Sequence, residues 1–336
     1  MNRKPKKRPG SMKAREKGDM SRARLMKEVF SEKLKVGIID IGLSPPALML
    51  EILVGRLGEK GIEVRLSSTL AAGRRAPSPI NGIDRKVEAF MEILYDESVS
   101  LVISARGGQG CMAFVRALRQ YFASSTFKKS FIEAVRRKVY VVSGDATALM
   151  LYLVRFGACG FYARHVASGP GAAGDLVRMI DAIASFNAFE LPAKTITAGE
   201  ARGRIMGGSA ETVAALAFSR LCATVESKIL YLESRGAADW LRGGCIEKLF
   251  EKLVAAGASS RLKGLVIGGL PPPAPGQLQL TPWDILHLDL SKLGIGGPVA
   301  LLADADRDPL RSLIPLGFRT SIVLRRDGRL CLAWVS

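Results

Sequence analysis

The chain has 336 residues, 48% of them hydrophobic, and a formal net charge of +18. A chain of this length and composition can bury the cores of two domains. The five cysteines are widely spaced without a C-x-x-C pair, so neither a disulfide framework nor a metal site is expected, and no cofactor is predicted. Apolar runs fall short of the roughly 20 residues that a membrane span needs, and no secretory signal follows the basic N-terminus. We therefore expect a cytoplasmic protein.

Residues 1–34 are predicted to form a basic, disordered arm. Residues 1–35 contain 13 Lys or Arg and four Asp or Glu, so that 13 − 4 = +9, half of the total charge. The first twenty residues hold few large apolar side chains that could offset the entropy of ordering. Such an arm would attract phosphate groups with salt-sensitive affinity, which predicts weak nucleic-acid contact through residues 1–35. A solvated tail, or a later start at Met12, Met20 or Met26, is the alternative.

Between residues 35 and 165, short apolar strands alternate with helical segments. Strands are expected at 36–41, 61–66, 100–104 and 139–142, helices at 47–57, 84–94, 112–122 and 147–156, and a loop at 67–83. This alternation predicts a Rossmann-like parallel sheet with helices on both faces. Ligands of such sheets bind beyond the carboxyl ends of the strands.

After residue 165 the pattern changes. Residues 166–195 are expected to link the domains, and residues 196–336 are expected to form a smaller mixed α/β domain. Helices are predicted at 211–222, 245–256 and 283–290, strands at 228–233 and 264–267, and a hairpin at 321–335 that turns at Asp327-Gly328. The predicted fold class is therefore α/β, with two domains.

Two glycine-containing segments follow strands of the predicted sheet. Residues 106–110 read RGGQG, and their free backbone N–H groups are suited to an oxyanion or phosphate nest, although a plain tight turn is the alternative. Residues 141–149 read VVSGDATAL and lead from a strand into a helix through small residues. In hydrolases of this architecture, such a junction is the nucleophile elbow.

Together these segments resemble the LD-carboxypeptidase family of serine peptidases. The family's glycine loop A-R-G-G-Y-G is similar to residues 105–110. Further motifs follow in order: GGNL is similar to residues 207–210, ILFLED to 229–234, GVLDGVKGIVLG to 257–268, and LPLG to 314–317. The resemblance runs over residues 35–325. It implies the family's two-domain fold and, since many members are dimers, a homodimer.

The differences from the family fall on its catalytic residues. The family's elbow reads G-Y-S-D, and the match at Asp145 puts Gly144 at the position of the nucleophilic Ser. Counting back from Pro315 puts Arg307 at the position of the catalytic His, while Glu233 matches the remaining member of the triad. A glycine cannot attack a carbonyl carbon, and an arginine stays protonated and cannot act as general base.

The resemblance therefore implies a pocket that binds ligand without acyl-enzyme chemistry. Arg106, Gly107, Gly108 and Asp145 would form its oxyanion and ligand-binding part, and Arg307 would add a positive charge suited to a carboxylate. The expected ligand is a small peptide or acyl-amide held between the domains.

Two alternatives stay open. An active peptidase or amidase would use a relocated nucleophile, either Ser143 re-aimed by a bulge or Cys111 directly after the glycine loop; for Cys111, a buried packing role is the competing interpretation. A nucleic-acid-associated protein would act through the basic arm. The only histidines, His165 and His287, are interpreted as structural.

Overall fold

The computed structural model describes most of the folded part of the chain. The described residues are 26, 29–30, 34–72, 82–123, 128–163, 172–185, 188–222, 224–233, 244–269, 290, 293–302 and 313–334. Residues 1–25, which are most of the predicted basic arm, lie outside them, as does nearly all of the helix predicted at 283–290.

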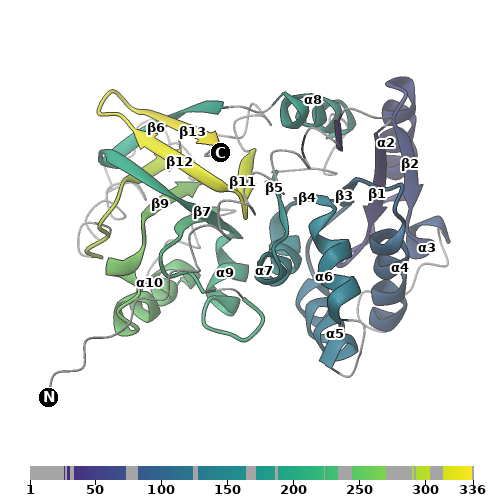
Figure 1. The fold of residues 1–336 in the computed structure, drawn as a ribbon, viewed down its shortest axis with the longest axis horizontal. Coiled ribbons are helices and arrows are strands. Elements are labelled where there is room, and N and C mark those ends of the chain that lie inside the picture. The colour runs from purple at the N-terminus through teal and green to yellow at the C-terminus, as the bar shows by residue number, and fades with distance from the viewer. Residues whose placement is uncertain are drawn as a thin grey trace, which may run out of the picture.

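A six-stranded sheet forms the N-terminal part of the molecule, at the right of Figure 1. Its order is β11-β5-β4-β3-β1-β2. The strands are β1 (Lys35–Ile39), β2 (Glu63–Leu66), β3 (Leu101–Ser104), β4 (Val139–Val142), β5 (Cys159–Tyr162) and β11 (Ile314–Leu316). Strands β1 to β5 are parallel, which confirms the predicted parallel sheet, and β11 pairs with β5 in the antiparallel sense. A strand from late in the chain thus completes the sheet.

Helices cover both faces of this sheet. One face carries α2 (Ala47–Glu59) and α8 (Ala172–Ala184), and the other carries α4 (Ile83–Tyr95), α5 (Cys111–Ala123), α6 (Lys128–Arg136) and α7 (Thr147–Leu153) (Figure 1). In strand β4, alternate residues pack against opposite faces of the sheet. Val139 and Val141 pack in the core beneath α2 and α8, whereas Tyr140 and Val142 pack on the opposite side. Burial on both faces explains why the strands are continuously apolar.

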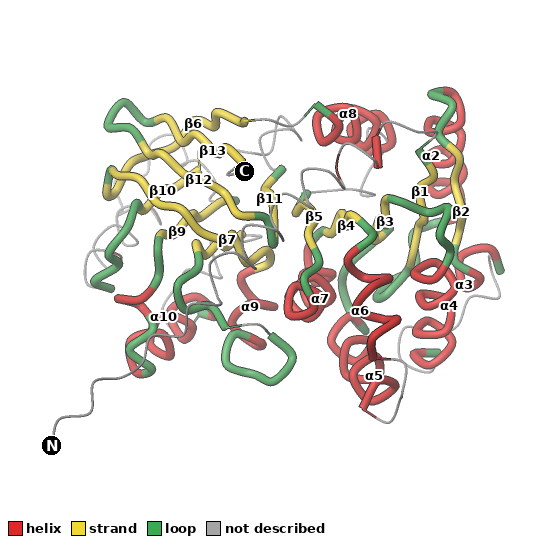
Figure 2. The backbone as a smooth tube through the Cα atoms, viewed as in Figure 1, coloured by secondary structure: helices red, strands yellow, loops and turns green. Residues whose placement is uncertain are grey.

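The C-terminal part is a closed barrel with helices at its side (Figure 2). Its order is β10-β6-β13-β12-β7-β8-β9. The elements are β6 (Ala188–Thr197), β7 (Gly199–Ser209), α9 (Ala210–Leu216), β8 (Ile229–Glu233), α10 (Cys245–Ala255), β9 (Gly264–Gly268), β10 (Val299–Leu302), β12 (Arg319–Leu324) and β13 (Arg329–Trp334). Closure pairs every strand on both sides and leaves no free edge.

Some predicted boundaries differ from the structure. The range 166–195 contains α8 and most of β6, and the loop predicted at 67–83 contains the short helix α3 (Ser68–Ala71). The helix predicted to end at residue 222 ends at Leu216. In the turn that follows this helix, the Ser219 hydroxyl accepts the Leu221 amide proton at 3.1 Å. Serine bonds of this kind compete with helical hydrogen bonds. The hairpin that turns at Asp327-Gly328 is confirmed by the β12–β13 pairing.

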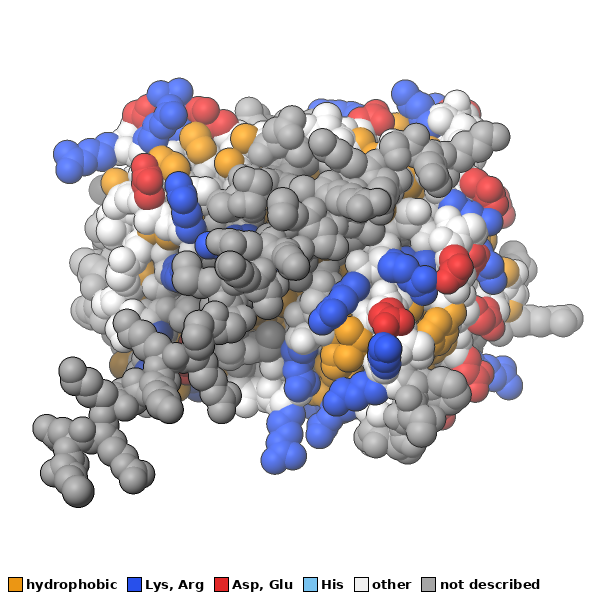
Figure 3. Space-filling model, viewed as in Figure 1, with side chains coloured by type: hydrophobic (Ala, Val, Ile, Leu, Met, Phe, Trp, Pro, Cys, Tyr) orange, Lys and Arg blue, Asp and Glu red, His pale blue; other side chains and the backbone are white. Residues whose placement is uncertain are grey.

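The two parts share a hydrophobic core. One continuous cluster of buried side chains runs from α4, α5 and α7 of the sheet into β7, β8, β9 and α9 of the barrel. Such an apolar seam favours a fixed arrangement of the two parts. On the surface, Lys and Arg side chains gather over α5 and α6 (Figure 3).

Candidate active site

The glycine loop follows β3 and packs on the turn that follows β4. A Cβ atom on Gly107 would lie 2.8 Å from the amide nitrogen of Asp145 and 2.8 Å from the carbonyl oxygen of Ser143. Both are backbone atoms, so only glycine permits this approach. Gly108 adopts a φ of +97°, which also favours glycine. The structure therefore brings the predicted glycine loop and the predicted elbow into direct contact.

The turn after β4 has the backbone shape of an elbow. Ser143 is extended, with φ −137° and ψ 151°, and Gly144 then adopts a φ of +50° at the start of η2 (Gly144–Ala146). A left-handed residue in a sharp strand-to-helix turn is the geometry that exposes the nucleophile of an elbow. That conformation costs other L-residues about 1–2 kcal/mol. Glycine removes this strain, and it places no side chain where the nucleophile would stand.

Hydrogen bonds hold Gly144 from both sides. Its amide donates to the Tyr162 hydroxyl at 3.3 Å, and its carbonyl accepts from the Thr147 hydroxyl at 2.6 Å. The Thr147 oxygen in turn accepts the amide proton of Ser209 at 3.0 Å. Tyr162 and Thr147 are both buried. The shape of the elbow is therefore fixed by side chains of the sheet part and by the backbone of the barrel part.

The carboxylate of Asp145 faces the barrel. It accepts a hydrogen bond from the Thr212 hydroxyl at 3.2 Å and a longer one from the Ser209 hydroxyl at 3.5 Å. Thr212 belongs to α9, and Ser209 is the last residue of β7. Asp145 therefore connects the elbow to the edge of the barrel.

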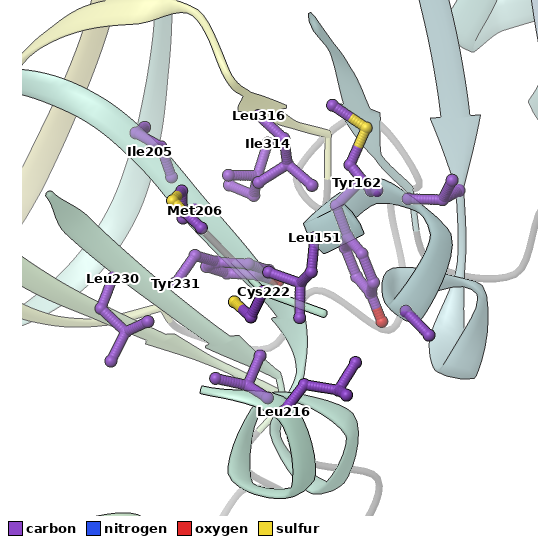
Figure 4. Close-up of a cluster of buried hydrophobic side chains, with 14 of the residues drawn as sticks. Leu151, Tyr162, Ile205, Met206, Leu216, Cys222, Leu230, Tyr231, Ile314 and Leu316 are labelled. Carbon is purple, nitrogen blue, oxygen red and sulfur yellow. The ribbon is translucent and has the colours of Figure 1, made fainter. Parts of the chain in front are cut away.

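Glu233 lies at that same edge. It ends β8, directly beside Ser209 of β7 and Gly268 of β9, and is only 4% exposed. Its carboxylate accepts a hydrogen bond from the buried Tyr231 hydroxyl at 2.8 Å. The Tyr231 ring lies 5.5 Å from the Tyr162 ring, centroid to centroid, within the buried cluster shown in Figure 4. Two tyrosines thus connect Glu233 with the amide of Gly144.

Arg106 supplies positive charge beside the glycine loop. Its side chain is exposed and forms no ion pair with a described carboxylate. A free guanidinium next to backbone N–H groups is suited to a carboxylate or phosphate group.

A buried ion pair supports the loop after β1, which contacts the glycine loop. Lys86 and Asp40 are fully buried and 3.1 Å apart, and Lys86 also donates to the Gly42 carbonyl oxygen at 2.6 Å. Ser44 donates to Asp40 at 2.8 Å. A Cβ on Gly42 would lie 3.0 Å from the Gly107 carbonyl oxygen. Strand order reverses between β1 and β3, where ligands bind in sheets of this kind.

The structure separates the two candidates for a relocated nucleophile. Ser143 is half-buried, and its hydroxyl makes no hydrogen bond with a described residue. Cys111 is 1% exposed, and its sulfur would lie 2.7 Å from a Cβ on Gly42, so it packs behind the loop. A third thiol, Cys222, lies in the seam, where burial raises its pKa to about 12 and disfavours the reactive thiolate.

Arg307, His165 and His287 lie outside the described residues. Within the described part of the chain, no group of three or more His, Cys, Asp or Glu side chains is placed to hold a metal ion. No helix in that part is both long and apolar enough to cross a membrane.

Residues 36–163 match the LD-carboxypeptidase N-terminal domain, and residues 202–305 match the LD-carboxypeptidase C-terminal domain. The chain belongs to the LD-carboxypeptidase family. No curated protein matches its sequence.

Solved LD-carboxypeptidase-like structures share this fold at low sequence identity. Muramoyltetrapeptide carboxypeptidase from Oxalobacter formigenes is 19% identical, with 89% of this chain and 99% of that chain covered and a TM-score of 0.70. An MccF-like protein from Bacillus anthracis is 19% identical, with 90% and 97% covered and a TM-score of 0.65. An MccF-like protein from Streptococcus pneumoniae in complex with AMP is 14% identical, with 89% and 98% covered and a TM-score of 0.66.

Sequence reasoning missed the side chains that hold this LD-carboxypeptidase site together. These are Tyr162, Thr147, Thr212, Tyr231 and the buried pair Asp40–Lys86. Ser209, whose amide donates to Thr147, also belongs to this group. It was the one member that the sequence could have indicated, because it lies in residues 207–210, which resemble the family motif GGNL. The others are ordinary strand and helix residues whose roles depend on contacts between distant segments.

Proposed function

We propose that this protein binds a small peptide or acyl-amide ligand at the glycine loop and the elbow, and does not hydrolyse it. One observation carries the proposal: Gly144 adopts the left-handed turn of a nucleophile elbow, with a φ of +50°, yet has no side chain to attack a carbonyl carbon. Arg307 in place of the family's histidine agrees with this view, because a guanidinium does not accept a proton near neutral pH.

The surroundings of the elbow support binding. The Gly107 backbone packs directly on the Ser143–Asp145 backbone, so the glycine loop and the elbow form one continuous backbone surface. Arg106 adds an exposed positive charge beside this surface. A carboxylate-bearing ligand fits this guanidinium. Glu233 already accepts a hydrogen bond from Tyr231, and it would orient ligand or neighbouring groups rather than an imidazole.

The test separates binding from turnover. The purified full chain would be titrated by calorimetry with a tetrapeptide whose last bond joins an L- and a D-residue, the bond that the family name describes. AMP would be a second ligand, because one similar structure holds it. The same mixtures would then be analysed by mass spectrometry for released amino acid. We expect heat of binding and no product. Turnover, or no binding of either compound, would refute the proposal.

Arg106→Gln provides the matched variant. The substitution removes an exposed charge that has no ion-pair partner among the described residues, so the fold should be unaffected. Loss of a charge-assisted bond to a ligand carboxylate should weaken binding by about tenfold. Arg326→Gln is the control, because Arg326 is equally exposed but lies in the β12–β13 turn. Equal effects of both variants would show that Arg106 does not contact the ligand.

The second candidate function is hydrolysis by Ser143. The observation in its favour is that this half-buried hydroxyl lies next to the elbow and has no hydrogen bond to a described residue. A fluorophosphonate probe would label the wild type and not Ser143→Ala if this serine were activated. Labelling by iodoacetamide that Cys111→Ala abolishes would instead identify Cys111, which its burial argues against. Absence of labelling by either probe would exclude both.

Three further expectations remain predictions. They are a homodimer, a cytoplasmic location, and weak nucleic-acid contact through residues 1–35. Light scattering on the full chain tests the first. Comparison of salt-dependent DNA binding by the full chain and by a chain lacking residues 1–24 tests the third.

A further inference from the structure

Five exposed arginines on α5, at the end of α6, and after α7 and α9 are here named the arginine surface. Its members are Arg116 and Arg119 of α5, Arg136 of α6, Arg155 of η3 (Val154–Phe156) and Arg220 after α9. Blue side chains over α5 and α6 mark part of this region in Figure 3. None of the five forms an ion pair with a described carboxylate.

Arg155 is the centre of this surface. Its guanidinium lies 5.9 Å from the ring centroid of Tyr152 and 6.0 Å from that of Phe156. It also donates a hydrogen bond to the carbonyl oxygen of Arg220. Arg136 donates to the carbonyl oxygen of Phe156 at 2.8 Å. The side chains of Arg155 and Arg136 thus meet at one turn, where Arg155 also contacts the backbone of Arg220.

The two arginines of α5 lie on one side of that helix. Arg116 and Arg119 are three residues apart, and side chains with this spacing lie on one side of a helix. Burial raises the pKa of Tyr152, while the positive charges of Arg155 and Arg119 act in the opposite direction on the same phenol. Arg119 and Arg155 therefore both lie near the phenol of Tyr152.

Aromatic rings accompany these charges. Phe218 is 48% exposed and lies two residues before Arg220. Rings of α5, α6 and η3 contact one another in the pairs Phe122–Phe131 and Phe131–Phe156. One exposed ring therefore lies in the same segment as Arg220, and packed rings join the elements that carry the arginines.

Several arginines elsewhere on the molecule are neutralised by carboxylates. Arg56, Arg137, Arg261 and Arg329 each pair with a nearby carboxylate. In the arginine surface, the acid of α6, Glu133, forms no ion pair with these groups. Uncompensated guanidinium groups attract phosphate, to which they bind in bidentate geometry, and flat exposed rings stack on bases.

We propose that the arginine surface binds single-stranded nucleic acid, with guanidinium groups on the phosphates and Phe218 stacked on a base. This inference goes beyond ligand binding at the elbow and does not depend on it. It also differs from contact through the basic arm, because it assigns affinity to the folded part of the chain. Recognition through phosphates and ring faces predicts little sequence preference.

The test uses fluorescence anisotropy of a labelled oligonucleotide of about 20 nucleotides, as DNA and as RNA, with the full chain. The variant Arg116→Gln/Arg119→Gln removes two charges. Counterion release predicts that the slope of log K against log salt falls in magnitude by about 1.4, and that affinity at about 0.1 M salt falls roughly 25-fold. A preference for RNA or for DNA would identify the natural source of the strand.

Arg325→Gln/Arg326→Gln is the matched control, because it removes two exposed arginines from the β12–β13 turn and leaves the basic arm in place. We expect it to keep nearly all of the wild-type affinity. Equal losses in the two double variants, or no binding by the wild type, would overturn the proposal. Binding to phosphatidylglycerol vesicles without binding to the oligonucleotide would also overturn it.

Phe218→Ala tests the stacking. Loss of one base–aromatic stack should lower the affinity for the oligonucleotide about tenfold, and Phe218→Trp should restore it. An abasic oligonucleotide should bind Phe218→Ala and wild type equally. If Phe218→Ala left the affinity for the normal oligonucleotide unchanged, the stacking part of the proposal would be wrong.

Discussion

The two halves of the candidate active site differ in the groups they present: one presents mainly backbone and the other presents side chains. The half contributed by the sheet, around Gly107 and Gly144, presents backbone, because glycines let the two turns pack directly on each other. The half contributed by the barrel, around Ser209 and Glu233, presents buried side chains that are already hydrogen-bonded. The shape of the first half depends on backbone packing, and the second half contributes side-chain contacts that hold the first in place.

This difference means that the shape of the site and its chemistry depend on different groups of atoms. The shape of the sheet half rests on close backbone contact between Gly107 and the turn after β4, which does not depend on the side chains around it. The catalytic group, by contrast, depends on single side chains. The sheet half should therefore tolerate changes of side chain but not of backbone space, and the barrel half should show the reverse.

The largest effect is expected beneath the sheet half, where one buried side chain supports the loops. Lys86→Met leaves the Asp40 carboxylate without its buried partner, and breaking such a pair costs about 3–5 kcal/mol in free energy of unfolding. Urea denaturation would measure it. Arg56→Met, which breaks an exposed pair with Glu59, should cost about 1 kcal/mol or less. Similar costs for both variants would show that the Lys86–Asp40 pair does not support the fold.

Gly208→Ala tests backbone space at the seam between the halves. A Cβ there would overlap the Thr147 hydroxyl, which two hydrogen bonds hold, and the φ of +133° disfavours any other residue. Overpacking and backbone strain together should cost about 2–4 kcal/mol of unfolding free energy, measured by urea denaturation.

Gly55→Ala is the control for that variant. Gly55 lies in α2 with open space around its position, so alanine should stabilise the helix by about 0.5–1 kcal/mol. If Gly208→Ala were as stable as wild type, the close contact between β7 and the elbow would be refuted.

Tyr231→Phe tests the side-chain half. It removes the hydroxyl that donates to the buried Glu233 carboxylate, and a hydrogen bond to a charged group contributes about 1.5–3 kcal/mol. Thermal unfolding should show a lowered midpoint. Tyr95→Phe removes an exposed hydroxyl and should change stability by less than about 0.5 kcal/mol. Equal midpoints for Tyr231→Phe and wild type would mean that Glu233 does not depend on Tyr231.

The smallest stability change is expected at the elbow. Gly144→Ser introduces a left-handed serine, at a cost of about 1–2 kcal/mol, and should not by itself yield hydrolysis. Gly144→Ser combined with Arg307→His introduces a serine and a histidine at the positions aligned with the family's catalytic residues, and should release amino acid from the tetrapeptide, as measured by mass spectrometry. Turnover by Gly144→Ser alone would show that a base is already present, and no turnover by the double variant would show that the site lacks more than these two groups.

The sequence predicted the sheet half well for physical reasons. Runs such as residues 139–142 are apolar throughout because both faces of β4 are buried, and that pattern is readable locally. Glycines at 107 and 144 are also visible in sequence. The barrel half was predicted less well. Strand β7 alternates burial only in part, and its pairing with β8 and β12 joins segments far apart in the chain.

The same limit applied to the side chains of the site. Thr147 looks like an ordinary first residue of a helix, and its hydrogen bond with the Ser209 amide exists only because Ser209 arrives from the barrel. Tyr231 looks like one more apolar residue of a buried strand. Roles of this kind arise from packing between distant segments, which no local pattern encodes.

The pairing of β11 with β5 bears on how the chain is made. On the ribosome, residues 159–162 emerge long before residues 314–316. Until then, β5 is an apolar edge strand with unpaired backbone groups, a surface that promotes association between nascent chains. We expect the nascent chain to need chaperone protection over this interval, and a fragment that stops before residue 314 to aggregate during expression.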